Sequence, residues 1–174
     1  MNKKQLAFLI LIHFMTDAYT SFSASLMPLI STKLDLTFTL VGTLTSVTAF
    51  ASLLQPAYGM ISDRIQYRLF TFIGPIFCAI FLSFIGLASS FWILSLFMLL
   101  GYLGNAAFHP QTAALAGMVS GSRKGLGISV WIFGGSLGLS FGPLFIVWVV
   151  QTFGLERSYL AAIPGLLAAA VLFR

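Results

Sequence analysis

Apolar residues along this chain occur in six long runs, which short polar segments separate. The runs cover about residues 5–31, 39–62, 69–89, 91–117, 126–150 and 158–173. As α-helices with a rise of about 1.5 Å per residue, most can cross a hydrocarbon layer of roughly 30 Å, and the sixth is short for a span. None alternates in the manner of a transmembrane barrel strand. The pattern therefore predicts an all-α protein, a polytopic membrane bundle of six helices that forms one domain over residues 1–174.

Polar side chains recur at helical spacing within three of the runs, so that each set forms a stripe on one helix face. The stripes are His13, Asp17, Thr20 and Ser21 in the first run, Thr45, Thr48, Ser52, Gln55 and Gly59 in the second, and Tyr102, Asn105, His109 and Thr112 in the fourth. The first, second, fourth and fifth helices are therefore expected to form the interior, with the third and sixth outside. Hydroxyl groups have an alternative role, because they also join transmembrane helices.

Asp17 is the one charged side chain that lies well inside an apolar run, one helical turn after His13. Ionisable groups at membrane depth are costly and usually mark ion or substrate pathways. His13 and His109 each lie about 12 Å from the same predicted boundary, with Asp17 about 6 Å deeper, so the three could share one cavity. Because histidine titrates near neutral pH, the set predicts a proton relay. A structural His–Asp hydrogen bond and a metal site of two histidines and a carboxylate are the competing interpretations. We expect neither a metal nor a cofactor.

The composition places the chain in a membrane, because 59% of its residues are hydrophobic and only 7% are charged. Its net charge of +5 does not indicate nucleic acid, since the basic residues occur in ones and twos rather than in a clustered stripe. One side of the predicted bundle carries Lys3, Lys4, Arg64, Arg68, Arg123, Lys124 and Arg174, and the other carries Lys33 and Arg157. The positive-inside rule then predicts that both termini are cytoplasmic, with the first run retained as a span.

Small residues and prolines mark the points where the helices are expected to approach closely or to break. Gly134, Gly138 and Gly142 recur every four residues and are followed by Pro143. Such spacing lets helix backbones pack tightly, while proline removes one helix hydrogen bond, so this segment is a candidate hinge or seal. Gln55-Pro56 and His109-Pro110 likewise place a polar side chain beside a predicted local break.

Two groups of residues form recognisable motifs: Gly59, Asp63-Arg64 and Arg68 after the middle of the second run, and Gly138 with Gly142-Pro143 in the fifth. The first resembles the loop signature of the major facilitator superfamily, which is thought to latch helices in one access state, and the second resembles the antiporter signature of the same superfamily. The likeness is closer still to the fosmidomycin-resistance branch. It rests on His13 and Asp17, Pro28, Ser52-Leu53-Leu54-Gln55-Pro56, Gly59 and Asp63, Phe108-His109-Pro110, Gly134-Gly135 and Gly142-Pro143-Leu144. Two positions depart from the pattern: Gln111 stands where an acid is expected, and Arg68 lacks the usual glycine and second base.

The resemblance implies a proton-coupled exporter of small, often anionic drugs such as fosmidomycin, which works by alternating access in a bacterial inner membrane. The proton gradient would drive it, and membrane lipid and a small-molecule substrate would be its partners. The predicted proton-relay and substrate-binding residues are His13, Asp17, His109, Gln55, Asn105 and Tyr102. The predicted gating residues are Gly59, Asp63, Arg64, Arg68, Gly138, Gly142 and Pro143.

Facilitators need two six-helix halves, so the chain is expected to be an N-terminal half that requires a second half or a second copy. A transporter is thus predicted rather than an enzyme. An intramembrane enzyme that uses His13, Asp17 and His109 and an inactive membrane fragment or subunit are the alternatives.

Overall fold

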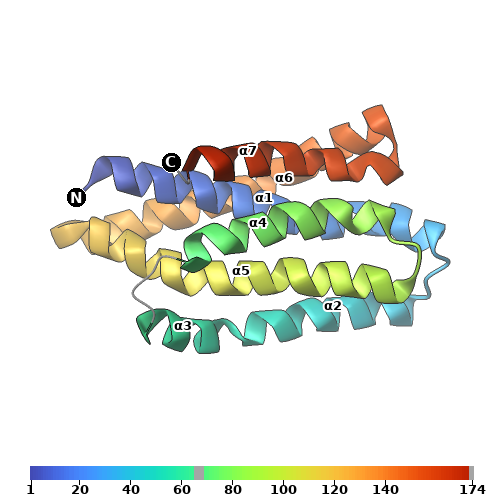
Figure 1. The fold of residues 1–174 in the computed structure, drawn as a ribbon, viewed down its shortest axis with the longest axis horizontal. Helices are drawn as coiled ribbons and strands as arrows, with labels where there is room; N and C mark the ends of the chain where they lie inside the picture. The colour runs from blue at the N-terminus through green and yellow to red at the C-terminus, as the bar shows by residue number, and fades with distance from the viewer. Residues whose placement is uncertain (65–68, 173–174) are drawn as a thin grey trace.

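The computed structural model describes residues 1–64 and 69–172, and this part of the chain consists of α-helices and short 3-10 helices. The elements are α1 (Lys3–Lys33), α2 (Phe38–Leu53), α3 (Gln55–Arg64), α4 (Leu69–Ser83), η1 (Phe84–Leu87), α5 (Phe91–Val119), η2 (Gly121–Arg123), α6 (Lys124–Phe153), η3 (Leu155–Ala161) and α7 (Ala162–Leu172). The long helices lie side by side and alternate in direction, and the start of α1 and the end of α7 lie toward the same end of the bundle, which we call the end that holds the termini (Figure 1). The predicted all-α bundle is confirmed.

Five segments of the described chain are long and apolar enough to cross a membrane. They are Lys3–Lys33, Phe38–Arg64, Leu69–Leu87, Phe91–Val119 and Gly121–Phe153. The chain is therefore a multi-pass membrane protein. The sixth apolar run corresponds to η3 and α7, which together return along the bundle from the far end (Figure 1). It is divided between a 3-10 helix and an α-helix of 11 residues, which explains why it is not among the five.

The second predicted helix is broken where Gln55-Pro56 led us to expect a local break. The α2 helix ends at Leu53, and the Leu54 amide donates to the Ala51 carbonyl three residues back, at 3.2 Å. Pro56 has no N–H group to continue the α-helical ladder. By contrast, Pro110 and Pro143 lie inside α5 and α6, which continue past them. A proline alone therefore did not identify which helix breaks.

The main helix contacts pair α1 with α6 and α4 with α5, while α2 and α3 pack on α5. The prediction that the third apolar run lies outside was wrong, because α4 packs against α1, α5 and α7. Its small residues explain the difference: Gly74 lies against Gly104 and Phe108 of α5, so closely that a Cβ at position 74 would come within 2.7 Å of both. In α2, only Leu44 and Ala51 are buried.

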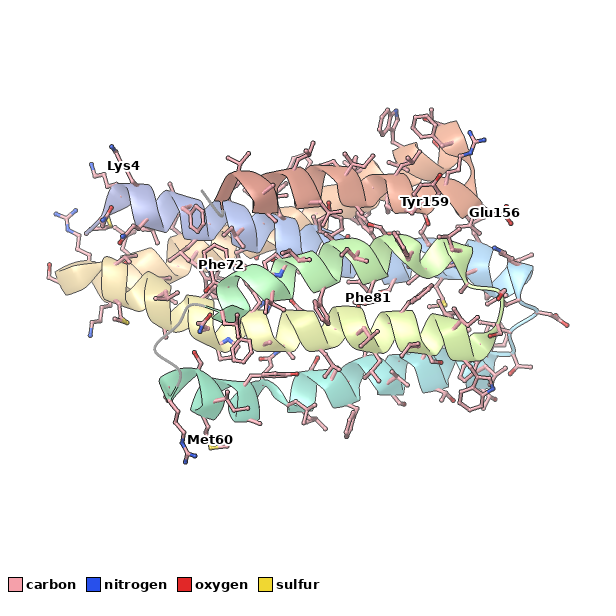
Figure 2. All side chains as sticks on the ribbon, in the orientation of Figure 1. Lys4, Met60, Phe72, Phe81, Glu156 and Tyr159 are labelled. Carbon is pink, nitrogen blue, oxygen red and sulfur yellow. The ribbon has the colours of Figure 1, made fainter. Side chains whose placement is uncertain are left out.

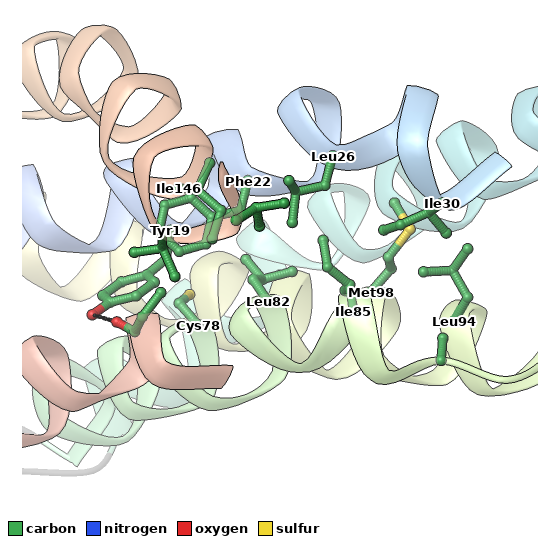
Figure 3. Close-up of a cluster of buried hydrophobic side chains, with 14 of the residues drawn as sticks. Tyr19, Phe22, Leu26, Ile30, Cys78, Leu82, Ile85, Leu94, Met98 and Ile146 are labelled. Carbon is green, nitrogen blue, oxygen red and sulfur yellow. Dashed lines mark hydrogen bonds between the residues drawn. The ribbon is translucent and has the colours of Figure 1, made fainter. Parts of the chain in front are cut away.

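Two separate clusters of buried apolar side chains fill the bundle. The larger runs along α1 from Tyr19 to Ile30 and includes Leu82 and Leu94 (Figure 3). The Tyr19 hydroxyl donates to the Ala161 carbonyl at 2.9 Å, so it ties α1 to the returning segment (Figure 3). The smaller cluster, near the chain termini, consists of Leu6, Leu9, Ile12, Phe108, Ala116 and Trp131. Along α1, the residues between Ile12 and Tyr19 separate the two clusters.

The two ends of the bundle differ in charge. Lys4 and Met60 lie at the end that holds the termini, whereas Glu156 and Tyr159 lie toward the opposite end (Figure 2). From the positions of their elements, Lys3, Lys4, Asp63, Arg64, Arg123 and Lys124 belong to the first end, and Lys33, Asp35, Glu156 and Arg157 belong to the second. The basic excess therefore lies with the termini. Arg68 and Arg174 fall outside the described residues.

Candidate functional site: a buried cluster of two histidines and an aspartate

The structure brings His13, Asp17 and His109 into direct contact, and we call these three residues the His–Asp–His cluster. His13 Nε2 lies 3.1 Å from Asp17 Oδ2, and His109 Nε2 lies 3.4 Å from Asp17 Oδ1. The two Nε2 atoms are 3.3 Å apart. The three side chains that were expected to lie close together therefore meet, while a shared cavity and a role in proton transfer stay predictions.

Helix geometry explains why residues so far apart in sequence converge. His13 and Asp17 are separated by four residues on α1, which places them on one face, one turn apart. The α5 helix runs antiparallel to α1 (Figure 1). His109, in the second half of α5, therefore lies beside the first half of α1. The cluster lies at the junction of the two apolar clusters, because it falls between Ile12 and Tyr19 on α1.

The outer nitrogen of each imidazole is held by a backbone carbonyl. His13 Nδ1 lies 2.8 Å from the Trp131 carbonyl of α6, and His109 Nδ1 lies 2.9 Å from the Asn105 carbonyl of its own helix. The Trp131 indole also stacks on the His13 ring, with 3.8 Å between centroids and an angle of 20° between planes. The orientation of both rings is thus fixed from outside the cluster.

Exposure differs within the cluster. The side chains of His13 and Asp17 are 5% and 12% exposed, whereas that of His109 is 24% exposed. The carboxylate is therefore enclosed by the bundle, as the sequence predicted for a functional acid at this depth. His109 is the member with the best access to the surroundings.

Glycines of α6 create the room that the cluster occupies. A Cβ atom at position 135 would lie 2.5 Å from Asp17 Oδ2 and from two atoms of the His13 ring. Gly134, Gly138 and Gly142 likewise lie against Ile10, Phe14 and Ala18 of α1. Neither Trp131 nor Gly135 was among the predicted site residues. Trp131 and Gly135 are four residues apart, and Gly138 and Gly142 follow after three and four more residues. This helical spacing was the available signal that they share the face toward α1.

The residues that we predicted to bind substrate divide into two groups. Tyr102 and Asn105 lie near the cluster on α5, but the Tyr102 hydroxyl is used between helices: it lies 2.8 Å from Ser23 Oγ and donates to the Thr20 carbonyl at 3.2 Å. The backbone carbonyl of Asn105 accepts from His109 Nδ1. The side-chain Oδ1 of Asn105 is buried and has no hydrogen-bond partner within the described chain. Gln55, half-buried at the start of α3, has no hydrogen bond to the cluster among the described residues. Substrate binding by these residues stays a prediction.

The predicted gating residues also occupy two regions. Gly59, Asp63 and Arg64 lie in α3, where Gly59 faces Pro110 of α5 at an ordinary contact distance and the two charged residues are exposed. Arg68 lies outside the described residues. Gly138 and Gly142 pack tightly on α1, and Pro143 lies within a continuous helix. Close packing thus accounts for the two glycines, and their part in gating stays a prediction.

Gln111, the position that departs from the family pattern, connects three helices. Its Oε1 accepts from the backbone amide of Thr71 at 2.7 Å and from the Thr71 hydroxyl at 3.0 Å, and its Nε2 donates to Ser62 Oγ at 3.0 Å. Thr71 is the third residue of α4, where backbone amides lack helical partners. The Gln111 side chain therefore holds the first turn of α4 and the last turn of α3 against α5.

The same cluster has a donor set that a metal ion can use. One ligand atom from each of His13, Asp17 and His109 can be chosen so that all three lie within 4.8 Å of one another. Imidazole and carboxylate groups suit several transition metals. The geometry alone is thus compatible with the metal site that we considered as an alternative.

Known proteins resemble this chain over most of its length. The family model for the Major Facilitator Superfamily matches residues 9–174. The chain is 33% identical over 161 residues to the fosmidomycin resistance protein of Escherichia coli (strain K12), an alignment that covers 92% of this chain and 40% of that protein. It is 28% identical over 146 residues to the uncharacterized MFS-type transporter YfnC of Bacillus subtilis (strain 168), covering 82% of this chain and 35% of that protein. The chain thus spans well under half the length of these relatives.

Proposed function

The chain belongs to the Major Facilitator Superfamily, as its motifs predicted, and on this premise we propose that it is half of a proton-coupled exporter of a small anionic or drug-like molecule. One observation carries the proposal: a carboxylate enclosed in the bundle contacts two imidazoles. Side chains that exchange protons near neutral pH are what a proton-driven antiporter needs at membrane depth. The similarity to a fosmidomycin resistance protein supports fosmidomycin-like substrates.

The distribution of charge supports a defined orientation. The end of the bundle that holds the termini also carries Lys3, Lys4, Arg64, Arg123 and Lys124. Because cytoplasmic loops carry the excess of lysine and arginine, we place this end in the cytoplasm of a bacterial inner membrane. Substrate then enters from that end.

In the proposed cycle, the His–Asp–His cluster takes up a proton in the outward-facing state and releases it in the inward-facing state. A second six-helix unit, either further along the chain or a second copy, supplies the other wall of the substrate cavity. Asp63 and Arg64 at the end of α3 stabilise one of the two access states. The proton gradient supplies the driving force, and no cofactor takes part.

Replacing the carboxylate tests the function. In cells that produce the whole transporter, we expect Asp17→Asn to abolish resistance to fosmidomycin and proton-driven export, with normal amounts of protein in the membrane. Asp35→Asn makes the same change in the exposed turn after α1, where the φ of 50° suits asparagine, and should leave export intact. Unchanged resistance in the Asp17→Asn strain would refute proton coupling through this residue.

An intramembrane enzyme is the second candidate, because the cluster could hold a metal ion. Metal analysis of the purified protein separates the two functions. Stoichiometric zinc or iron that is lost on Asp17→Asn would favour the enzyme, whereas its absence after purification without chelators would favour the transporter.

A further inference from the structure

A groove between α1, α4 and α5 lies near the end of the bundle that holds the termini. Its volume is about 330 Å³, within the range of roughly 300–1,000 Å³ that is typical of ligand pockets. The lining includes Lys4, Phe8 and Leu9 of α1, Phe72 of α4, and Leu115 and Val119 of α5. None of the lining residues belongs to the His–Asp–His cluster, so the groove is a separate feature of the fold.

Polarity changes along the groove. Lys4 is exposed in the first turn of α1, whereas Phe8, one turn or about 6 Å deeper, is half-buried and Leu9 is buried. Phe72 and Leu115 continue this apolar wall on the two neighbouring helices. Lys4 lies toward the end that holds the termini, and Phe72 lies farther along the bundle (Figure 2). The groove therefore has a cation at its outer end and an apolar wall below it, which suits an amphiphilic ligand with an anionic head.

The Lys4 ammonium group has no carboxylate partner among the described residues. The ion pairs in this part of the chain use Asp17 and Glu156 as their acids. Asp63 is the acid that the described chain places nearest to this end, but it lies at the exposed end of α3 and does not line the groove. An anionic group that enters the groove therefore meets an unpaired cation.

Further positive charge surrounds the outer end of the groove. The Asn2 amide donates to the Val119 carbonyl at 2.7 Å, which holds the start of α1 against the end of α5. From there the chain continues into η2 and the start of α6, which carry Arg123 and Lys124, while Lys3 precedes Lys4 in α1. Basic pockets between transmembrane helices on the cytoplasmic side favour anionic lipid headgroups, because that leaflet has a negative surface potential.

The shape and chemistry of the groove favour a phospholipid over a small free anion. The Thr71 amide, at the start of α4, already donates to Gln111 Oε1 at 2.7 Å, so it supplies no second donor for an anion beside Lys4. Most of the lining is apolar and can bind an acyl chain instead. Thr71 and Phe72 also line a hollow of about 20 Å³ beside Gly165 of α7, with room for about one water molecule. The groove thus narrows where α7 covers α1 and α4.

We infer that this groove binds one anionic phospholipid of the cytoplasmic leaflet, with its phosphate at Lys4 and an acyl chain against Phe8, Phe72 and Leu115. The inference uses the proposed orientation of the bundle but no part of the proposed transport cycle. A lipid held in this way contacts α1, α4 and α5 together. Because it binds the folded bundle, it should raise the stability of the protein.

Thermal unfolding of the purified, delipidated whole transporter in detergent tests the inference. The probes are phosphatidylglycerol, phosphatidylcholine with the same acyl chains, and glycerol phosphate, which is the headgroup without chains. We expect phosphatidylglycerol to raise the melting temperature at concentrations where the other two do not, and native mass spectrometry to show one phosphatidylglycerol molecule retained. Equal stabilisation by phosphatidylcholine would indicate a general requirement for lipid, and stabilisation by glycerol phosphate would indicate a small-anion site. Either result would overturn the inference.

A pair of lysine variants tests the charged end of the site. Lys4→Gln should weaken phosphatidylglycerol binding about fivefold, the factor that one basic residue near a membrane surface contributes. Lys3→Gln makes the same change of charge outside the lining and should weaken binding about twofold or less. Both lysines are exposed, so neither substitution should affect folding. Equal effects of the two variants would mean that the lipid responds only to the overall charge of this end, which contradicts a site at Lys4.

A pair of tryptophan variants tests the apolar wall. Leu115→Trp should fill the groove and remove the stabilisation by phosphatidylglycerol. Met118→Trp adds a similar bulk to the same helix at a position that is 73% exposed and outside the lining, so it should leave the stabilisation intact. Stabilisation that survives in Leu115→Trp would overturn the inference, as it would if another part of the whole transporter covered the groove. If Leu115→Trp does not fold, the two lysine variants decide the outcome.

Discussion

Gly135 of α6 lies directly against the carboxylate of Asp17, and any side chain at this position would collide with it. A Cβ there would come within 2.5 Å of Asp17 Oδ2 and of the His13 ring, which is shorter than real Cβ contacts. The carboxylate cannot withdraw freely, because its two oxygens face two different histidines. The missing side chain at position 135 is therefore a condition for the cluster to assemble.

We expect Gly135→Ala to disrupt export more than it disrupts folding. Alanine favours the helix by up to about 1 kcal/mol, while the added methyl group overpacks the site at a cost of about 1–3 kcal/mol. The displaced atoms belong to the cluster, so export should fall at least tenfold with a small change in melting temperature. Gly42→Ala is the matched control, since nothing lies within 4 Å of its added Cβ. Wild-type export by Gly135→Ala would contradict the close contact.

Gly138→Ala should instead act on stability. Its Cβ would collide with the backbone carbonyl of Phe14 and lie 3.0 Å from the Ala18 amide. Backbone atoms cannot turn aside as a flexible side chain can, so α1 and α6 must separate, with a loss of about 1–3 kcal/mol. Thermal unfolding in detergent measures the loss. A variant with normal stability but slow export would favour the hinge interpretation of this glycine over packing.

The Gln111 side chain offers a test of how the end of α3 and the start of α4 are held against α5. Gln111→Leu keeps the volume but removes the acceptor of the Thr71 amide and the donor to Ser62, so we expect a loss of about 1–3 kcal/mol for the buried groups left unsatisfied. Gln111→Glu restores the acid of the family pattern. Its carboxylate can accept from Thr71 and Ser62, and the first turn of α4 favours a negative charge. Thermal unfolding at neutral pH should therefore show Gln111→Glu closer to wild type than Gln111→Leu, and the reverse order would contradict this network.

Tyr102→Phe asks whether this tyrosine serves packing or substrate. Removing the hydroxyl breaks its contacts with Ser23 and the Thr20 carbonyl, and a hydrogen bond of this kind contributes about 0.5–1.5 kcal/mol. We expect a small fall in melting temperature and an unchanged KM for export. Ser23→Ala should give a similar fall, and the double variant should cost less than the sum, because both lose the same bond. A raised KM in Tyr102→Phe alone would restore the substrate-binding role.

The sequence was most informative where membrane physics limits the choices. Apolar runs located the helices, because a bilayer requires long unbroken segments, and depth counted from the run ends brought His13, Asp17 and His109 together. The position of α4 was not predictable in this way, since it depends on Gly74 and Gly104 meeting across two helices. The contact between the Trp131 carbonyl and His13 could not be predicted either, because every residue has a backbone carbonyl. The partners of Gln111 come from α3 and α4, and pair contacts between helices have no signature in a single sequence.

The segment that contains α2 is the least buried of the five candidate membrane spans in the described chain. Only Leu44 and Ala51 of this helix are buried, and the break at Leu54 divides it from α3. In a bilayer, lipid tails replace lost contacts between apolar helices at little cost. We therefore expect α2 to move more easily than α1, α5 and α6, which hold the two histidines and the carboxylate in contact, and such a movement would change access to these three residues while leaving them assembled.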